Sequence, residues 1–216
     1  MNLQKKISEA DLQRIKNAVK EAESKISGEI VPVLLERSGT YSIASYRAAT
    51  ALAAISFLLI VVFDRYVPTL AIYDPLFIFM VVLSAGFVGV LLSQWMDWIK
   101  RMVLTQQHLD NVTWQKAESL FLQEEVFNTR QRSGIMIFVS FFEHEVIVMA
   151  DKGISKVVEQ KVWDKLVQEL TGSIKAGKVV NGLEVAIKRC GEILLEKGFL
   201  ISADDTNELK DDLRIK

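Results

Sequence analysis

The sequence predicts an α/β domain, a small mixed sheet with helices on both sides, interrupted by a hairpin of two transmembrane helices. Three observations lead to this prediction. Two long, uncharged apolar runs follow one another in the first half of the chain. Charged residues are abundant before Arg47 and after Lys100 but scarce between them. Outside that region, apolar residues recur at helical spacing or form short continuous runs typical of buried strands.

The apolar runs predict the two membrane spans. Neither Ala48–Phe63 nor Leu76–Trp95 contains a charged residue. A helix needs about 20 apolar residues to cross a bilayer, so the first span must begin earlier, with Arg47 extending its guanidinium toward the lipid headgroups. We therefore predict spans at about 43–63 and 76–95. The alternative, a buried helical hairpin in a soluble core, is disfavoured by the length of both runs.

Charges around the hairpin predict its orientation. The connector Asp64–Asp74 holds two acids and one arginine, whereas its outer flanks carry Arg37, Arg47, Lys100 and Arg101. Positive residues favour the cytoplasmic side, so both the N-terminal and the C-terminal part should be cytoplasmic. Neither span holds the acid, base or histidine that ion-coupled transport needs at depth. The hairpin is therefore interpreted as an anchor.

Small residues gather in the second span, at Ser84, Ala85, Gly86 and Gly89. Small side chains allow two membrane helices to approach closely. They either pack the two helices of this hairpin together or form the contact of a homo-oligomer.

Composition limits the partners and the compartment. The 216 residues have a formal net charge of −1, and without clustered Lys and Arg we expect no nucleic-acid partner. The single cysteine, Cys190, lies on the apolar face of a predicted helix and fits a buried residue in a reducing compartment. Met1–Ala10 is polar and lacks the apolar segment of a signal peptide.

The soluble parts contain helices and strands on both sides of the hairpin. Before it, the pattern predicts a helix from Ser8 to about Ile26 and a strand at Glu29–Leu35, in which Pro32 indicates an edge or a bulge. After it, the expected elements are a helix at Thr105–Phe127, strands at Ile135–Phe141 and Val146–Ala150, and helices at Ile154–Leu170 and Leu183–Lys197.

One helix and one strand cannot bury their own apolar faces, so the parts before and after the hairpin should assemble into one domain. The predicted organisation is an N-terminal part at 1–41, the transmembrane hairpin at 42–99, a C-terminal part at 100–200 and a charged, flexible tail at 201–216. Two spans return the chain to the same side of the membrane, which permits this assembly.

A series of segments resembles the TPM-domain family. Those in the second half are Arg130-Gln-Arg-Ser-Gly-Ile-Met-Ile-Phe-Val-Ser, Phe142-Glu-His-Glu-Val-Ile-Val-Met-Ala-Asp-Lys-Gly-Ile, Trp163 and Gly182-Leu-Glu-Val-Ala-Ile. The first half agrees through Ile7-Ser-Glu-Ala-Asp-Leu and Ser27-Gly-Glu-Ile-Val-Pro-Val. Asn207-Glu-Leu-Lys-Asp is similar to the tail of bacterial membrane members.

The resemblance implies a TPM-like α/β fold and a place in the inner membrane of a bacterium. It also implies two possible activities, since some plant members are described as acid phosphatases and some soluble domains bind a divalent ion through acidic loop residues. This chain has Ala150-Asp-Lys-Gly-Ile where many soluble members have a glycine-rich turn. A full set of phosphatase acids does not map onto it.

Asp151 is the candidate site residue, because it ends a buried strand just before a helix, where α/β sheets often bind ligands. It is either a ligand of a divalent cation, which needs companion oxygens, or the cap of the following helix. His144 lies in a turn, and the sequence lacks a His-Glu-x-x-His zinc pattern. No catalytic or cofactor-binding residue is predicted.

The first functional hypothesis is a non-catalytic interaction or accessory module, anchored in the lipid bilayer, that assists a membrane-protein assembly. The alternative is a divalent-metal-dependent phosphatase that uses Asp151. A channel or transporter subunit is the third possibility. The expected partner is a membrane protein, and a homo-oligomer is possible.

Overall fold

The computed structural model describes residues 7–67, 74–201 and 207–216, which fall into two compact units. Unit 1 comprises Met1–Ser38 and Asp110–Lys216, and unit 2 comprises Gly39–Leu109. Three segments lie outside the described residues: 1–6, which belong to the N-terminus that lacks a signal-peptide pattern, 68–73 in the predicted connector, and 202–206 in the predicted tail.

Unit 1 is built on a four-stranded mixed sheet with the order β3-β2-β1-β4. Strands β1 (Glu29–Leu35) and β2 (Gly134–Ser140) are parallel, and their register pairs the first residue of each. Strand β3 (Glu145–Ala150) is antiparallel to β2, and β4 (Arg214–Ile215) is parallel to β1. The predicted mixed sheet is thus confirmed, and strands from before and after the hairpin pair directly.

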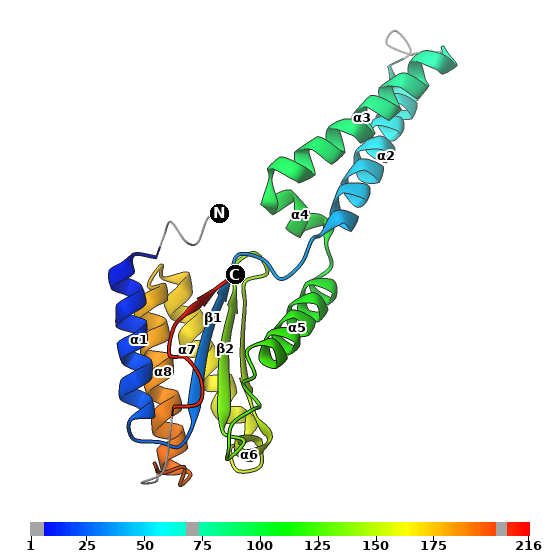
Figure 1. The fold of residues 1–216 in the computed structure, drawn as a ribbon. Helices are drawn as coiled ribbons and strands as arrows, with labels where there is room; N and C mark the ends of the chain where they lie inside the picture. Colours follow the sequence, from blue (N-terminus) through cyan, green and yellow to red (C-terminus); the bar gives the residue numbers. More distant parts are fainter. Residues whose placement is uncertain (1–6, 68–73, 202–206) are drawn as a thin grey trace. The chain divides into compact units, whose positions relative to one another are not determined.

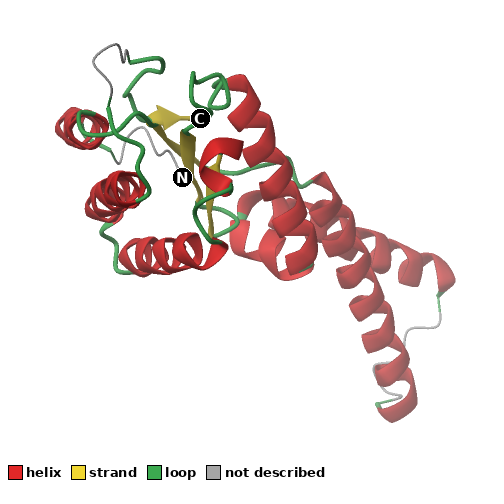
Figure 2. Cartoon of the chain, turned by 90° about the horizontal axis from the view of Figure 1, so that it is seen from below, coloured by secondary structure: helices red, strands yellow, loops and turns green. Residues whose placement is uncertain are grey.

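Helices cover both faces of this sheet, as predicted (Figures 1 and 2). On one face, Ile30 and Leu34 of β1 share a core with α1 (Glu9–Glu23), α7 (Gln160–Lys175) and α8 (Val179–Glu196). On the other face, the alternate residues of β1 pack with helix α5 (Gln106–Gln123). These are Val31, Val33 and Leu35, which share a core with Ala117 and Leu120. Every residue of β1 and β2 is buried, which explains why both strands read as continuous apolar runs.

Local sequence explains where the helices begin. Helix α1 starts at a capping box in which the Ser8 hydroxyl accepts from the Asp11 N–H and the Asp11 carboxylate accepts from the Ser8 N–H. The helix expected at Ile154–Leu170 is instead two helices, α6 (Lys152–Ser155) and α7. The Ser155 hydroxyl donates to backbone carbonyl groups at the start of α6, a local bond that competes with helix continuation.

The outer edge of β1 is only partly covered, which accommodates Pro32. Strand β4 pairs with β1 at Val33 and Leu34 alone. Nearer the start of the strand, the Ile30 N–H donates to the Glu23 carboxyl group at 2.8 Å. Pro32 faces this edge between the two places and has no N–H to satisfy.

Residues 207–216 are not a free tail, in contrast to the expectation from their charge. The Lys216 N–H donates to the Leu34 carbonyl at 3.0 Å, next to β4. Arg214 and Lys216 both contact the carboxylate of Glu124, and Asp212 pairs with Lys16 at 2.7 Å. The charges that predicted mobility are the groups that bind this segment to the domain.

Unit 2 is a hairpin of α2 (Ser42–Tyr66) and α3 (Pro75–Trp95), followed by the short helix α4 (Asp97–Val103). Asp74 caps α3 and Pro75 occupies its first turn, a favourable helix start. Both long helices are apolar enough to cross a membrane, with mean hydropathies of 2.0 and 2.6. In the most apolar 18-residue stretch of each helix, only 6% and 11% of the residues are buried in the structure.

The two helices of the hairpin pack side by side (Figure 1). A Cβ atom at Gly89 would lie 2.7 Å from the Ala48 carbonyl oxygen, which is closer than a real Cβ approaches backbone. One helical turn farther along, the Ser93 hydroxyl donates to the Ser45 hydroxyl at 2.9 Å. The structure therefore shows small residues packing this hairpin, while a homo-oligomeric contact stays a prediction.

We predict that Gly89→Ala destabilises the hairpin, because the added methyl group must displace the backbone of α2. The expected loss is about 1–3 kcal/mol, as for other overpacked sites. Gly86→Ala is the matched control, since its Cβ would meet its nearest atom at 3.6 Å, an ordinary contact. Thermal unfolding of both variants in one detergent, followed by circular dichroism, should show a lower midpoint for Gly89→Ala. Equal midpoints would contradict the close approach.

Candidate functional site

Asp151 lies where the sequence analysis placed it, between β3 and α6, and both of its oxygens have partners. Arg132 donates through Nε to Oδ2 at 2.6 Å and through Nη2 to Oδ1 at 3.0 Å. The Lys152 N–H also donates to Oδ1, at 2.7 Å, which caps α6. A Cβ at Gly153 would lie 2.6 Å from the Arg132 carbonyl, so a glycine is needed to bring this loop against the start of β2.

This geometry matches the capping alternative for Asp151. A planar guanidinium fork and a backbone N–H occupy the carboxylate, which is itself buried. Across the described parts of the chain, no three His, Cys, Asp or Glu side chains are grouped so that they could hold a metal ion. A cation at Asp151 would have to displace Arg132 and recruit other ligands, and a role as metal ligand stays a prediction.

The turn between β2 and β3 also serves to hold the chain. His144 has a positive φ of 58° there. The neighbouring Glu143 is fully buried and accepts from the Ser38 N–H at 2.8 Å and from the Ser140 hydroxyl. The Ser38 hydroxyl in turn donates to Ser140 at 3.0 Å. This network fixes the last residue of the first segment of unit 1, just before the chain enters unit 2.

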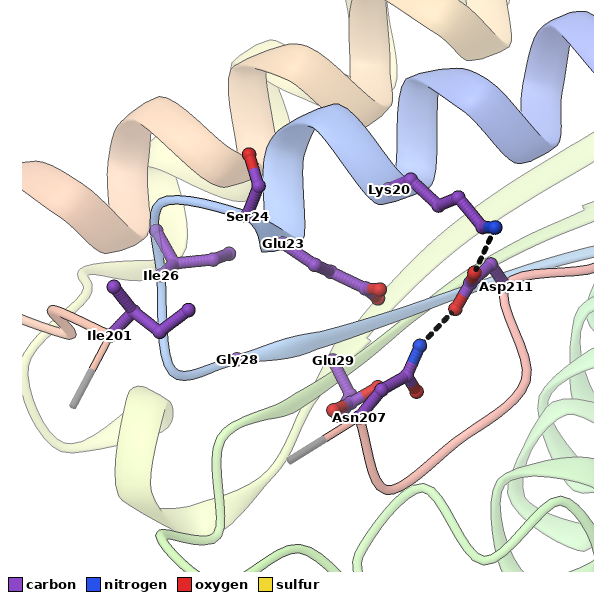
Figure 3. Close-up of a pocket in the computed structure, with 9 residues that line it drawn as sticks. All are labelled: Lys20, Glu23, Ser24, Ile26, Gly28, Glu29, Ile201, Asn207 and Asp211. Carbon is purple, nitrogen blue, oxygen red and sulfur yellow. Dashed lines mark hydrogen bonds and ion pairs between the residues drawn. The ribbon is translucent and has the colours of Figure 1, made fainter. Parts of the chain in front are cut away.

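A second group of carboxyl groups lines a cleft of about 330 Å³ that the sequence analysis did not predict (Figure 3). The cleft lies where the end of α1, the start of β1 and the C-terminal segment meet. Its lining residues are Lys20, Glu23, Ser24, Ile26, Gly28, Glu29, Ile201, Asn207 and Asp211.

The carboxylates of the cleft bind the C-terminal segment. Glu29 accepts from the backbone N–H groups of Glu208 at 3.0 Å and Leu209 at 3.3 Å. Asp211 accepts from the Asn207 side chain at 2.6 Å and lies 3.9 Å from the Lys20 ammonium. Figure 3 shows the Glu23 carboxyl group pointing toward Asp211 across the cleft.

Burial changes the protonation of these groups. The pKa of Glu23 is raised to about 8, chiefly because burial desolvates the carboxyl group and also because Glu29 and Asp211 are nearby charges, while the hydrogen bond from Ile30 acts in the opposite direction. The pKa of Glu29 is also raised, chiefly by burial. Glu23 therefore carries a proton at neutral pH. The cleft therefore binds the C-terminal segment and holds one carboxyl group whose burial favours the neutral form.

Little in the sequence indicates this cleft. Glu23 lies in the last turn of an amphipathic helix, and Glu29 begins a strand, so each resembles an ordinary surface acid. Asp211 belongs to the segment predicted to be flexible. The one available signal was a charged residue, Glu29, at the start of an otherwise apolar strand.

The family model for the TPM domain matches residues 99–193. Residues 99–193 therefore carry a TPM domain. The match begins within α4, covers α5, β2, β3, α6, α7 and most of α8, and does not include β1, which the hairpin separates from the remainder. No curated protein matches the chain.

A solved structure supports the fold of this TPM domain. The NMR structure of BA42 protein from the psychrophilic bacterium Bizionia argentinensis superposes with a TM-score of 0.59 at 18% sequence identity. The superposition covers 97% of this chain and 95% of the other. At this identity the similarity establishes a shared fold and nothing about activity.

We predict that Asp151→Asn and Arg132→Ala destabilise the TPM domain by similar amounts, about 1–2 kcal/mol. Each removes the same ion pair, between half-exposed Arg132 and buried Asp151, and leaves a capping residue at position 151. Asp164→Asn, on the exposed side of α7, is the control and should have little effect. Chemical unfolding in one detergent measures all three.

The same experiment tests a cation at Asp151. If the residue is structural, adding Ca²⁺ or Mg²⁺ leaves the unfolding midpoint of the wild-type protein unchanged. A midpoint that rises with the cation, falls with a chelator and no longer responds in Asp151→Asn would show that Asp151 is a metal ligand.

We predict that Glu23 makes stability fall with rising pH. Its pKa is 4.5 when unperturbed and about 8 in the folded state, so its contribution is complete below 4.5 and lost as the pH rises through 8. The free energy of unfolding of Glu23→Gln should equal that of the wild type at about pH 4 and exceed it by about 2–4 kcal/mol at about pH 9. Glu21→Gln removes an exposed charge from the same helix and should leave the pH profile unchanged.

Proposed function

We propose that this chain is a membrane-anchored TPM domain that acts as a non-catalytic interaction or accessory module for a membrane-protein assembly. Its hairpin spans the inner membrane of a bacterium, with the N-terminal and C-terminal parts in the cytoplasm. Unit 1 is the acting domain, and unit 2 holds it at the membrane.

The observation that carries the proposal is the exposed apolar surface of α2 and α3. A soluble protein that contained these helices would bury them, whereas here only 6% and 11% of their most apolar stretches are buried. Their lengths, Ser42–Tyr66 and Pro75–Trp95, suit a bilayer that needs about 20 residues. A lipid environment is the solvent that such a surface fits.

Charge supports the proposed orientation. Arg37, Arg47, Lys100 and Arg101 lie on the side of the hairpin from which both ends of the chain continue. The described part of the connector, at the other end, has Asp64 and Asp74 against a single arginine. This asymmetry has the sign expected when unit 1 is cytoplasmic.

Features of unit 1 favour interaction over catalysis. Asp151, the predicted ligand, is bound by Arg132 on both oxygens. The acids of the cleft serve the C-terminal segment. Trp114 and Leu122, which lie toward one side of α5, are exposed, and an exposed tryptophan is a typical anchor of protein–protein contacts. The proposed docking surface for a membrane-protein partner is this side of α5.

Site-specific photocrosslinking in native membranes tests the partner. A photoreactive amino acid in place of Trp114 should give a crosslinked product of one size containing an integral membrane protein, and the same group in place of exposed Lys165 on α7 should not. Products that are equal at both positions would contradict a docking surface on α5. Phosphomonoester hydrolysis by the purified protein, abolished in Asp151→Ala, would replace this proposal with the phosphatase.

We predict that the connector is external. Tyr66→Cys, at the exposed end of α2, should react with a membrane-impermeant maleimide in intact cells, whereas Lys165→Cys should react only after lysis. The native Cys190 is a suitable background because it is fully buried and burial raises the pKa of its thiol to about 12. The reverse labelling pattern would invert the orientation.

A further inference from the structure

The helix α4 is separated from the second long helix by a turn in the backbone. Helix α3 ends at Trp95, and Met96 has extended dihedral angles (φ −123°, ψ 103°) before α4 begins at Asp97. The chain therefore changes direction at the end of the apolar helix and does not continue it. A short helix in this place packs on protein, faces water or lies against lipid.

The outward face of α4 is apolar and aromatic. Trp98 is 59% exposed and Met102 is 70% exposed, and their spacing of four residues puts them on the same face of the helix. Trp95, at the end of α3, is 83% exposed. Tryptophan combines a large apolar ring with an N–H donor and concentrates at the level of lipid headgroups.

The inner side of α4 is attached to the hairpin. The Arg47 guanidinium of α2 donates through Nη1 to the Val103 carbonyl at 3.1 Å. Val103 is the last residue of α4, so this bond satisfies a carbonyl group left free at the helix end and places a cation at the negative end of its dipole. Arg47 was expected to reach lipid headgroups, which stays a prediction, and the structure adds that its guanidinium also binds the end of α4.

The charges of α4 favour a lipid surface over a second protein. Lys100 and Arg101 accompany the apolar residues, and Asp97 pairs with Lys100 at 3.5 Å within the helix. Basic residues beside tryptophan and methionine are typical of helices that lie in the interface of a membrane. The face also continues the exposed apolar surface of α3 directly along the chain.

We propose that α4 is an interfacial helix that lies in the headgroup region of the bilayer and inserts Trp98 and Met102 toward the acyl chains. This inference rests on the proposed function, because it requires α2 and α3 to span the membrane. Helix α4 fixes the depth of the hairpin, and Arg47 sets the angle at which the helix leaves it.

Spin labels on single cysteines test this placement. The full chain is reconstituted in nanodiscs of phosphatidylcholine and phosphatidylglycerol, with the label at Met102→Cys on α4, Phe79→Cys on α3 or Lys165→Cys on α7. Power saturation measures how accessible each label is to oxygen, which enters lipid, and to a nickel chelate, which stays in water. The ratio of oxygen to nickel accessibility at Met102 should exceed that at Lys165 several-fold and stay below that at Phe79.

Three other outcomes would contradict the proposal, each in a different way. A label at Met102 that matches the aqueous one at Lys165, while Phe79 remains deep, overturns the interfacial helix and leaves the membrane anchor intact. A label at Met102 that neither oxygen nor nickel reaches indicates a protein contact, either a second copy or a partner, and also overturns it. An aqueous label at Phe79 overturns the proposed anchor itself.

Discussion

The parallel pairing of β1 with β2 is the contact on which the structure depends. β1 precedes the hairpin and β2 follows it, yet the two strands pair along their whole length. Every side chain of both strands is buried, and β1 contributes to the apolar cores on both faces of the sheet. Without this pairing, α1 and β1 would have no sheet to join, and α5 would lose much of the surface that it covers.

This pairing limits what can be inserted between the strands. Leu35, the last residue of β1, and Ser140, the last of β2, lie opposite each other, and the buried Glu143 holds Ser38 beside them. The chain therefore leaves the sheet at a fixed point. Within the proposed function, two spans satisfy the constraint and one span does not, because only an even number returns the chain to the same side of the membrane.

The sequence predicted much of this architecture because its signals were local. The strand bounds at Glu29–Leu35 and the start of a helix at Ser8 follow from neighbouring residues. The place of residues 207–216 did not, since it depends on contacts with Glu29 and Glu124, far away in sequence. The role of Arg47 was missed for the same reason, because its acceptor, Val103, belongs to a helix that the apolar pattern did not reveal.

In the candidate site, too, local features could be predicted and long-range contacts could not. Asp151 was found because it stands between a strand and a helix, and its two alternatives could be named, but the arginine that occupies it comes from another part of the chain. The acidic cleft could not be predicted from the sequence, because Glu23, Glu29 and Asp211 come together only after folding.

Hydrogen–deuterium exchange of the full chain in lipid nanodiscs tests most directly that one TPM domain closes across a membrane-embedded hairpin. The account predicts slow exchange in β1, matching that of β2, together with slow exchange throughout α2 and α3. Fast exchange in β1 beside a protected β2 and β3 would show that the strands do not pair across the insertion. Fast exchange in α2 and α3 would show that the hairpin is not in the bilayer.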